Sequence, residues 1–385
     1  AWITRAWTDP NDRGGPPPEM FWRLPRSVHS ATYGRSADPK HLEPILAGIR
    51  HAAGVLLAKG PVSAASRSAV DAFLATIPLH GGTVVSAQGL VPIDEPAPGS
   101  KATRTPASAI LDIKRLVYES TGWSVVGVEA PASSYVTWLE KTSTMVQHLL
   151  RDAAADKALA EDLRNAKWVP KLRVRKGVAG YPQGTTALDV TSDFDSRDVW
   201  EFTKTSQAGD EGGTEHPKGA AAKGSITLRL VVVPDGQNRA WIGLSAHDAT
   251  LRAQMRIVTS PGKTEETVGS LDGLEALRAS SSPGGGFFHY GNALRMALRA
   301  ARLAATERER AKIDTVVATL PHQLQTPMLL FVGGKAGTRP TLGMSFHVQA
   351  GTLEDVAALV RYAMSEEGRK HLESLDAGDA AAGAD

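Results

Sequence analysis

Residues Val70 to Pro78 read V-D-A-F-L-A-T-I-P, and residues Ile313 to Pro321 read I-D-T-V-V-A-T-L-P. The two stretches share Asp, Ala, Thr and Pro, and most of their other positions exchange one apolar residue for another. In each stretch, apolar residues recur three and four positions apart, which predicts an amphipathic helix that ends at the proline. The match between the two stretches predicts an internal duplication.

The flanks of both stretches predict the same order of elements. A short strand and a helix precede each stretch, and two strands and a further helix follow it. We therefore expect two β-α-α-β-β-α units, repeat 1 over residues 22–152 with an insertion at 93–122, and repeat 2 over residues 284–366. The expected strands are Val28–Tyr33, Thr83–Ala87 and Trp123–Ala130 in repeat 1, and Phe287–Tyr290, Met328–Val332 and Gly343–Ala350 in repeat 2.

Two helix starts carry more specific expectations. Asp38 and Pro39 resemble an N-cap and a first helical residue. Because proline disrupts a helix interior, Pro44 offers the alternative that regular helix begins only around Leu42. Thr352 with Asp355 resembles a capping box, so Thr352 is expected to cap the last helix of repeat 2. The insertion of repeat 1 is expected to hold its own helix from Ala107 to Tyr118.

The remaining segments differ in character from the two repeats. Residues 153–283 form a β-rich middle, interrupted at 204–224 by a stretch of Gly, Ala, Ser, Lys and Glu that is typical of a flexible loop. Residues 1–21 have the composition of a leader or linker, and residues 367–385 that of a disordered tail. We expect an α+β fold with one or two antiparallel sheets covered by helices.

Composition limits the classes of function. The chain has 385 residues, 42% of them hydrophobic and 22% charged, which is typical of a globular protein. A formal net charge of +2 gives no strong nucleic-acid signal. The absence of cysteine excludes disulfides and thiolate chemistry. The sequence has no run of about 20 apolar residues, so no membrane span is predicted within the chain. An export signal or anchor upstream of Ala1 is left open.

The strongest catalytic candidates are two G-x-S-x-H strands. Ile242 to His247 reads I-G-L-S-A-H, and Leu342 to His347 reads L-G-M-S-F-H. Ser245 with His247, or Ser345 with His347, could supply a nucleophile and a base. Strand alternation puts each serine and histidine on one face, side by side, with Leu244, Ala246, Met344 and Phe346 expected on the core face.

Two alignments favour a structural origin of these strands. Matching Val128–Ala130 with Val348–Ala350 places Val125 opposite Ser345 and Gly127 opposite His347, so repeat 1 lacks both reactive groups. An ungapped match of residues 226–247 with 326–347 retains mainly apolar positions. We therefore interpret G-x-S-x-H as a repeated strand pattern whose glycine allows close backbone approach, with a serine hydrolase as the alternative.

Metal and phosphate sites are weakly indicated. Asp193, Asp195, Asp198 and Glu201 offer carboxylates for calcium, but the glycine that an EF-hand loop requires is missing, so a solvated turn is the preferred interpretation. The histidines have no zinc-ligand spacing, and no metal or cofactor is expected. The glycines of Gly284–Gly286 are interpreted as a linker rather than a phosphate loop.

A basic strand is the remaining candidate. Lys171, Arg173 and Arg175 alternate along one strand face, where they could contact a polyanion. The competing interpretation is that these charges keep an edge strand from pairing with another molecule.

The composition, rich in Ala, Arg and Gly, is similar to that of exported bacterial proteins. We expect a non-catalytic protein of the cell envelope or exterior that binds an unknown ligand or partner, with a cytoplasmic location left open. The alternatives are the serine hydrolase and a purely structural envelope protein.

Overall fold

The computed structural model describes residues 15–36, 39–60, 62–92, 106–156, 159, 169–196, 222–260, 264–289, 291, 316–323, 325–335, 341–366 and 368–369. These residues form an α+β fold built on a single ten-stranded sheet, in which every neighbouring pair of strands is antiparallel. The expected fold class is confirmed at this level. Residues 1–14 of the expected leader 1–21, the segment 197–221 and the tail from residue 370 lie outside the described residues. The end of the expected leader is instead part of the folded body, because Met20 and Phe21 lie in a helix and are buried.

The sheet has the strand order β10-β9-β8-β1-β2-β3-β7-β6-β5-β4, so β10 and β4 are its edges. The strands are β1 Ser30–Ser36, β2 Gly82–Gly89, β3 Trp123–Val128, β4 Lys171–Lys176, β5 Thr186–Asp195, β6 Lys223–Pro234, β7 Ala240–Ser245, β8 Gly284–His289, β9 Pro327–Lys335 and β10 Thr341–His347. Lys223 and Gly224, expected in a loop, therefore belong to β6.

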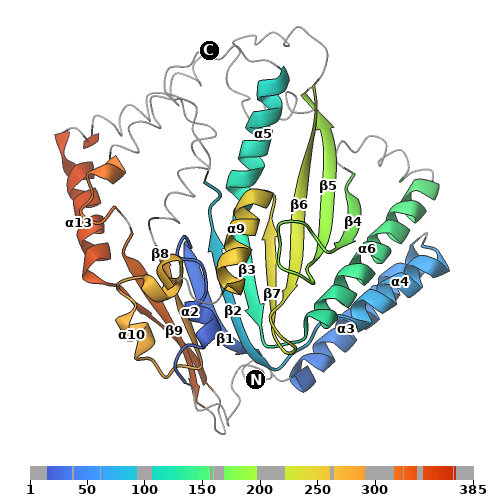
Figure 1. Ribbon diagram of the computed structural model, residues 1–385, viewed down its shortest axis with the longest axis horizontal. Coiled ribbons are helices and arrows are strands. Elements are labelled where there is room, and N and C mark those ends of the chain that lie inside the picture. The colour runs from blue at the N-terminus through green and yellow to red at the C-terminus, as the bar shows by residue number, and fades with distance from the viewer. Residues whose placement is uncertain are drawn as a thin grey trace.

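Helices cover the sheet unevenly (Figure 1). They are α2 Glu19–Trp22, α3 Pro39–Lys59, α4 Ala64–Ala75, α5 Pro106–Thr121, α6 Ala132–Ala155, α9 Asp248–Thr259, α10 Glu275–Arg278 and α13 Ala350–Met364, with short 3-10 turns at Thr264–Glu266 and Val268–Ser270. The helices α3, α4 and α6 lie together at one end of the molecule, and α13 lies at the other. The helix α9 packs on β7 and β3, near the middle of the sheet.

The main core lies on the face of the sheet that α2 and α9 cover. Phe21 of α2 and Trp241 of β7 are fully buried there, and Leu251 and Met255 of α9 pack into the same cluster. A methyl group at Gly243 would lie 2.6 Å from the sulfur of Met255, so the expected close backbone approach at this glycine is the approach of α9.

The β8 glycines are strand residues rather than the expected linker. A Cβ at Gly286 would lie 2.1 Å from the carbonyl oxygen of Ala31 on the neighbouring strand. The sequence signal misleads here because glycine suits a turn and a crowded ladder equally well.

Several helix boundaries also differ from expectation. The helix α3 begins at Pro39, the first helical residue that the sequence predicted, and the alternative start near Leu42 is wrong because Pro44 lies inside the helix. Gln349, not Thr352, occupies the N-cap of α13, and Asp355 instead accepts a hydrogen bond of 2.8 Å from the backbone N–H of His322. A tertiary contact has replaced the local capping box.

The hairpins β6–β7 and β9–β10 pair in different registers. Leu230 lies opposite Leu244, whereas Met344 lies opposite Val332 rather than Leu330. The ungapped match of residues 226–247 with 326–347 can therefore align the first strands of the two hairpins or their second strands. It cannot place both strands at equivalent positions of the ladder. A shift of two residues preserves which side chains share a face.

Candidate functional site

Ser245 ends β7 and is buried, and its hydroxyl is fully engaged with the backbone. Its Oγ donates to the carbonyl of Gly122 at 2.8 Å and accepts from the N–H of His247 at 3.0 Å. The imidazole of His247 caps α9, with Nδ1 accepting from the N–H of Thr250 at 3.3 Å. The serine and the imidazole thus fix the turn into α9 and are not hydrogen-bonded to each other.

The expected core face was wrong for Leu244, Met344 and Phe346, whereas Ala246 is buried as expected. Leu244 is 36% exposed, while Ser245 is 1% exposed, because α9 packs on the serine side of β7. On β10, Met344 and Phe346 are exposed together with Ser345 and His347. Alternation alone does not say which face meets the core, and it says nothing of a strand at the sheet edge.

The acidic candidates do not form a metal site within the described part of the chain. Asp193 forms an exposed ion pair with Lys171, 2.6 Å between Oδ2 and Nζ. Asp195 ends β5, and Asp198 and Glu201 lie outside the described residues. Across the described ranges, no three carboxylates or imidazoles converge on one point.

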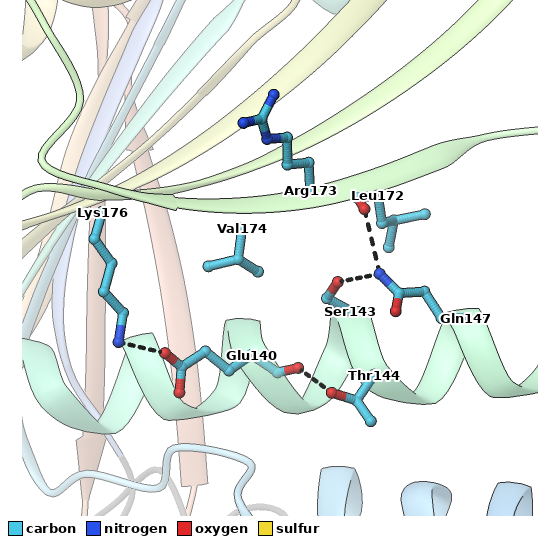
Figure 2. Close-up of a pocket in the computed structure, with 8 residues that line it drawn as sticks. All are labelled: Glu140, Ser143, Thr144, Gln147, Leu172, Arg173, Val174 and Lys176. Carbon is cyan, nitrogen blue, oxygen red and sulfur yellow. Dashed lines mark hydrogen bonds and ion pairs between the residues drawn. The ribbon is translucent and has the colours of Figure 1, made fainter.

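The basic candidates lie on β4, at one edge of the sheet. Lys171 is paired with Asp193, and Nη2 of Arg175 lies 2.6 Å from Oδ2 of Asp189. Arg173 points away from the side of β4 that carries Val174 (Figure 2). A polyanion would have to compete with acids that already neutralise two of the three cations.

A partly buried charge network that the sequence did not predict joins β5, β6 and α9. Arg229 donates to both carboxylate oxygens of Asp189, at 2.7 and 3.2 Å, and also to Asp248. Asp248 further accepts from the Tyr181 hydroxyl at 2.8 Å and from Arg252. The only sequence signal was a charged residue in each of two apolar strand segments; only the pairing of Asp189 with Arg229 brings them together.

The titration behaviour of this network favours a structural role. Burial acts to raise the pKa of Asp248, but the hydrogen bond from Tyr181 and the charge of Arg229 outweigh it and lower that pKa. Burial and the bond to Asp248 raise the pKa of Tyr181. Asp248 is therefore an ionised acceptor and Tyr181 a protonated donor, so neither is prepared to exchange a proton near neutral pH.

An open groove of about 500 Å³ lies between α6 and β4 (Figure 2). Along it, Nε2 of Gln147 donates to the backbone carbonyl of Leu172 at 3.3 Å and to Oγ of Ser143 at 3.2 Å. Lys176 forms an ion pair with Glu140, 2.8 Å between Nζ and Oε1. The polar groups of the groove are thus paired with one another, and Gln147 occupies a main-chain carbonyl of the edge strand.

Among the described residues, the opposite edge of the sheet carries no such protection. The strand β10 reads T-L-G-M-S-F-H and has no Asp, Glu, Lys or Arg. Met344 is 64% exposed and Phe346 57% exposed. Further exposed apolar residues continue from the end of β10 along α13: Val348, Leu353, Val356, Val360 and Met364. Exposed apolar side chains in this number on one strand and the helix that follows it indicate an interaction site.

Comparisons with known proteins add no identity to this picture. No protein-family model, curated protein or solved structure matches the chain. In the part of the chain that the structure describes, no helix is both long and apolar enough to cross a membrane.

Proposed function

We propose that this protein is a non-catalytic binding protein of the cell envelope or exterior, and that it binds a polypeptide partner along the open edge of β10. The observation that carries the proposal is the uncharged edge strand on which Met344 and Phe346 are exposed. Such an edge accepts an extended segment, because its unpaired main-chain groups can bond to an added strand.

We further propose that β1–β2–β3 and β8–β9–β10 are two copies of one unit. The sequence alignment makes Gly127 equivalent to His347. Gly127 pairs with Val85 on β2, and His347 pairs with Leu329 on β9. Val85 and Leu329 are 0% and 1% exposed, so the equivalence joins two core residues on the same face of the sheet.

The contact between the two units supports the same inference. On the next strand of each unit, Val85 pairs with Tyr33 of β1, and Leu329 pairs with Phe287 of β8. Tyr33 and Phe287 are therefore equivalent as well. Tyr33 lies opposite Gly285, and Ala31 lies opposite Phe287, so exchanging the units maps this ladder onto itself. Phe21 makes edge-on ring contacts with both Tyr33 and Phe287, at centroid distances of 5.2 and 6.3 Å. This is the arrangement of two units related by a local twofold axis.

The stretches that first suggested the duplication also end alike. Thr76 donates from Oγ1 to the carbonyl of Phe73 at 3.0 Å, and the aligned Thr319 donates to the carbonyl of Val316 at 2.7 Å. Residues 313–315 of the second stretch lie outside the described residues, so this likeness concerns only the helix ends.

The equivalence of β3 and β10 indicates which kind of strand could pair with β10. The edge of β3 is occupied by β7, which pairs with it along its whole length. Among the described residues, no strand pairs with the corresponding side of β10. A segment resembling β7 is therefore the polypeptide that this edge fits best.

A peptide of residues 240–247, A-W-I-G-L-S-A-H, is a suitable probe. We expect it to bind the full chain and to slow amide hydrogen exchange in residues 341–347, at a dilution where the chain is monomeric. A control peptide in which proline replaces Leu244 should neither bind nor protect residues 341–347, since proline removes a main-chain hydrogen-bond donor from the ladder. Absence of both binding and protection with the first peptide would refute strand addition at this edge.

The compartment is tested separately. The composition and the expected leader support export, so the protein should be recovered with the envelope or medium when cells of its source are fractionated. Recovery in the cytosolic fraction alone would contradict this part of the proposal.

A further inference from the structure

We propose that the polypeptide at the β10 edge is β10 of a second copy of this chain. The inference rests on the proposed function and names its partner. The sequence of β10 provides the first argument: L-G-M-S-F-H resembles I-G-L-S-A-H, the stretch that contains most of β7. The strand β10 thus corresponds in position to β3 and resembles in sequence the strand that β3 binds.

The register follows from the β3–β7 ladder. Val125 of β3 lies opposite Gly243 of β7. Val125 corresponds to Ser345 by the alignment of the two units, and Gly243 corresponds to Gly343 by the shared G-x-S-x-H pattern. Ser345 of one copy should therefore lie opposite Gly343 of the other.

A second pair gives the same register. Trp123 lies opposite Ser245, which places Gly343 of one copy opposite Ser345 of the other. Antiparallel pairing of two copies of one strand is symmetric in any register, so the ladder serves here to fix the position of the twofold axis. The axis then passes beside Met344, which lies opposite Met344 of the second copy.

Side-chain chemistry agrees with self-pairing at this edge. Residues near a twofold axis meet their own copies, so a charge there would meet a like charge. The strand β10 has no Asp, Glu, Lys or Arg. On β4, by contrast, Lys171, Arg173, Arg175 and Lys176 would oppose one another in any antiparallel self-pairing.

The exposed face of α13 provides an independent argument. In the first unit, α6 follows β3 and packs over strands beyond it, with Leu139 buried against Leu188 and Val232. The helix α13 follows β10 in the same way, but Leu353 and Met364 remain 59% and 71% exposed. A second copy would supply strands beyond β10, and each α13 could then cover the exposed apolar side chains of the other copy's β10.

Cross-linking tests the register directly, because the chain has no cysteine of its own. We expect Met344→Cys to form an intermolecular disulfide on mild oxidation. Phe346→Cys is the matched control: in this register the two copies of residue 346 are offset by about 13 Å along the strands. That is far beyond the Cα separation of about 7 Å that a disulfide allows. Equal cross-linking of the two variants would contradict the register.

Charge exchange tests the pairing itself. We expect the mass of the wild-type chain in solution to approach that of a dimer as concentration rises. Met344→Lys and Met344→Glu should each weaken the dimer about tenfold, and an equimolar mixture should restore it. Met344 is exposed in the monomer, so both variants should fold.

A wild-type chain that stays monomeric throughout, or a dimer that neither charge weakens, would overturn the inference. The proposed function has its own test in the 240–247 peptide. If that peptide still protects β10 while the chain remains monomeric, strand addition stands and only the identity of the partner is wrong.

Discussion

The two edges of the sheet solve the same physical problem differently. An edge strand exposes main-chain donors and acceptors that can pair with another molecule. At β4, basic side chains line the strand, acids neutralise them, and Gln147 occupies the carbonyl of Leu172. At β10 the strand is uncharged, and Met344 and Phe346 are exposed.

This difference indicates which edge is available for association. The acids on β5, the charge network on β6 and α9, and the amide on α6 all stabilise the β4 end without a partner. The β10 end has exposed apolar side chains that gain free energy only when something covers them, at about 25 cal/mol per Å² of apolar surface buried. The β4 end should therefore respond to charge and pH, and the β10 end to concentration.

The largest expected effect is loss of the partly buried Arg229 of β6. Arg229→Ala removes the cation that Asp189 and Asp248 share, but each acid keeps a second arginine, so the free energy of unfolding should fall by about 3 kcal/mol, the lower limit for breaking a buried ion pair. Arg252→Ala is the control, because Arg252 contacts Asp248 from a side chain that is 47% exposed, and it should cost about 0–1 kcal/mol. Urea denaturation measures both. Equal losses would contradict the central role of Arg229.

Acid should weaken the same end of the sheet. The pKa of Asp248 is lower in the folded protein than its ordinary value, so its stabilising contribution is complete above that ordinary value and is lost as pH falls through the lowered pKa. We expect the free energy of unfolding to fall below about pH 4, and Asp248→Asn to flatten this dependence. Hydrogen exchange should rise in β5 and β6 before it rises in β8 and β9. Simultaneous loss across the sheet would refute this order.

Much of the fold was predictable because local patterns determine it. The apolar spacing before Pro78 predicted α4, whose N-cap is Ser63 and whose Val70 and Leu74 are buried. The strands β6 and β7 lie in the middle segment 153–283, which was predicted to be β-rich, and a Pro-Asp-Gly turn joins their apolar runs. These signals depend on neighbours in sequence, so they survive without knowledge of the tertiary structure.

The sites were much less predictable, because they depend on contacts between distant residues. His247 looked like a catalytic base, yet it caps α9, a helix that the apolar pattern did not reveal. Asp189 and Arg229 are forty residues apart and meet only through the β5–β6 register. The exposure of Met344 depends on strand order, since the same alternation on an inner strand would bury one face.

An intermediate effect is expected from the two serines of the G-x-S-x-H strands. Ser245→Ala removes a buried donor to Gly122 and an acceptor for the His247 N–H, and should cost about 1–3 kcal/mol. Ser345→Ala, on the exposed edge, should stay within about 0.5 kcal/mol. Thermal unfolding at low concentration measures both. A fluorophosphonate should label neither serine, and labelling of either would restore the hydrolase interpretation, because such labelling requires an activated hydroxyl.

The smallest effect concerns how the β4 edge is closed. Gln147→Ala frees the carbonyl of Leu172 and should cost about 0.5–1.5 kcal/mol, because the bond lies at an exposed position. If the basic side chains alone keep β4 from pairing, Gln147→Ala should not make the chain associate through this edge. The double variant Gln147→Ala, Arg173→Val should then associate. Sedimentation of Met344→Lys carrying these changes isolates β4 from the β10 edge. Association of the Gln147→Ala variant without the Arg173 change would mean that the amide cap, and not the basic side chains, keeps β4 from pairing.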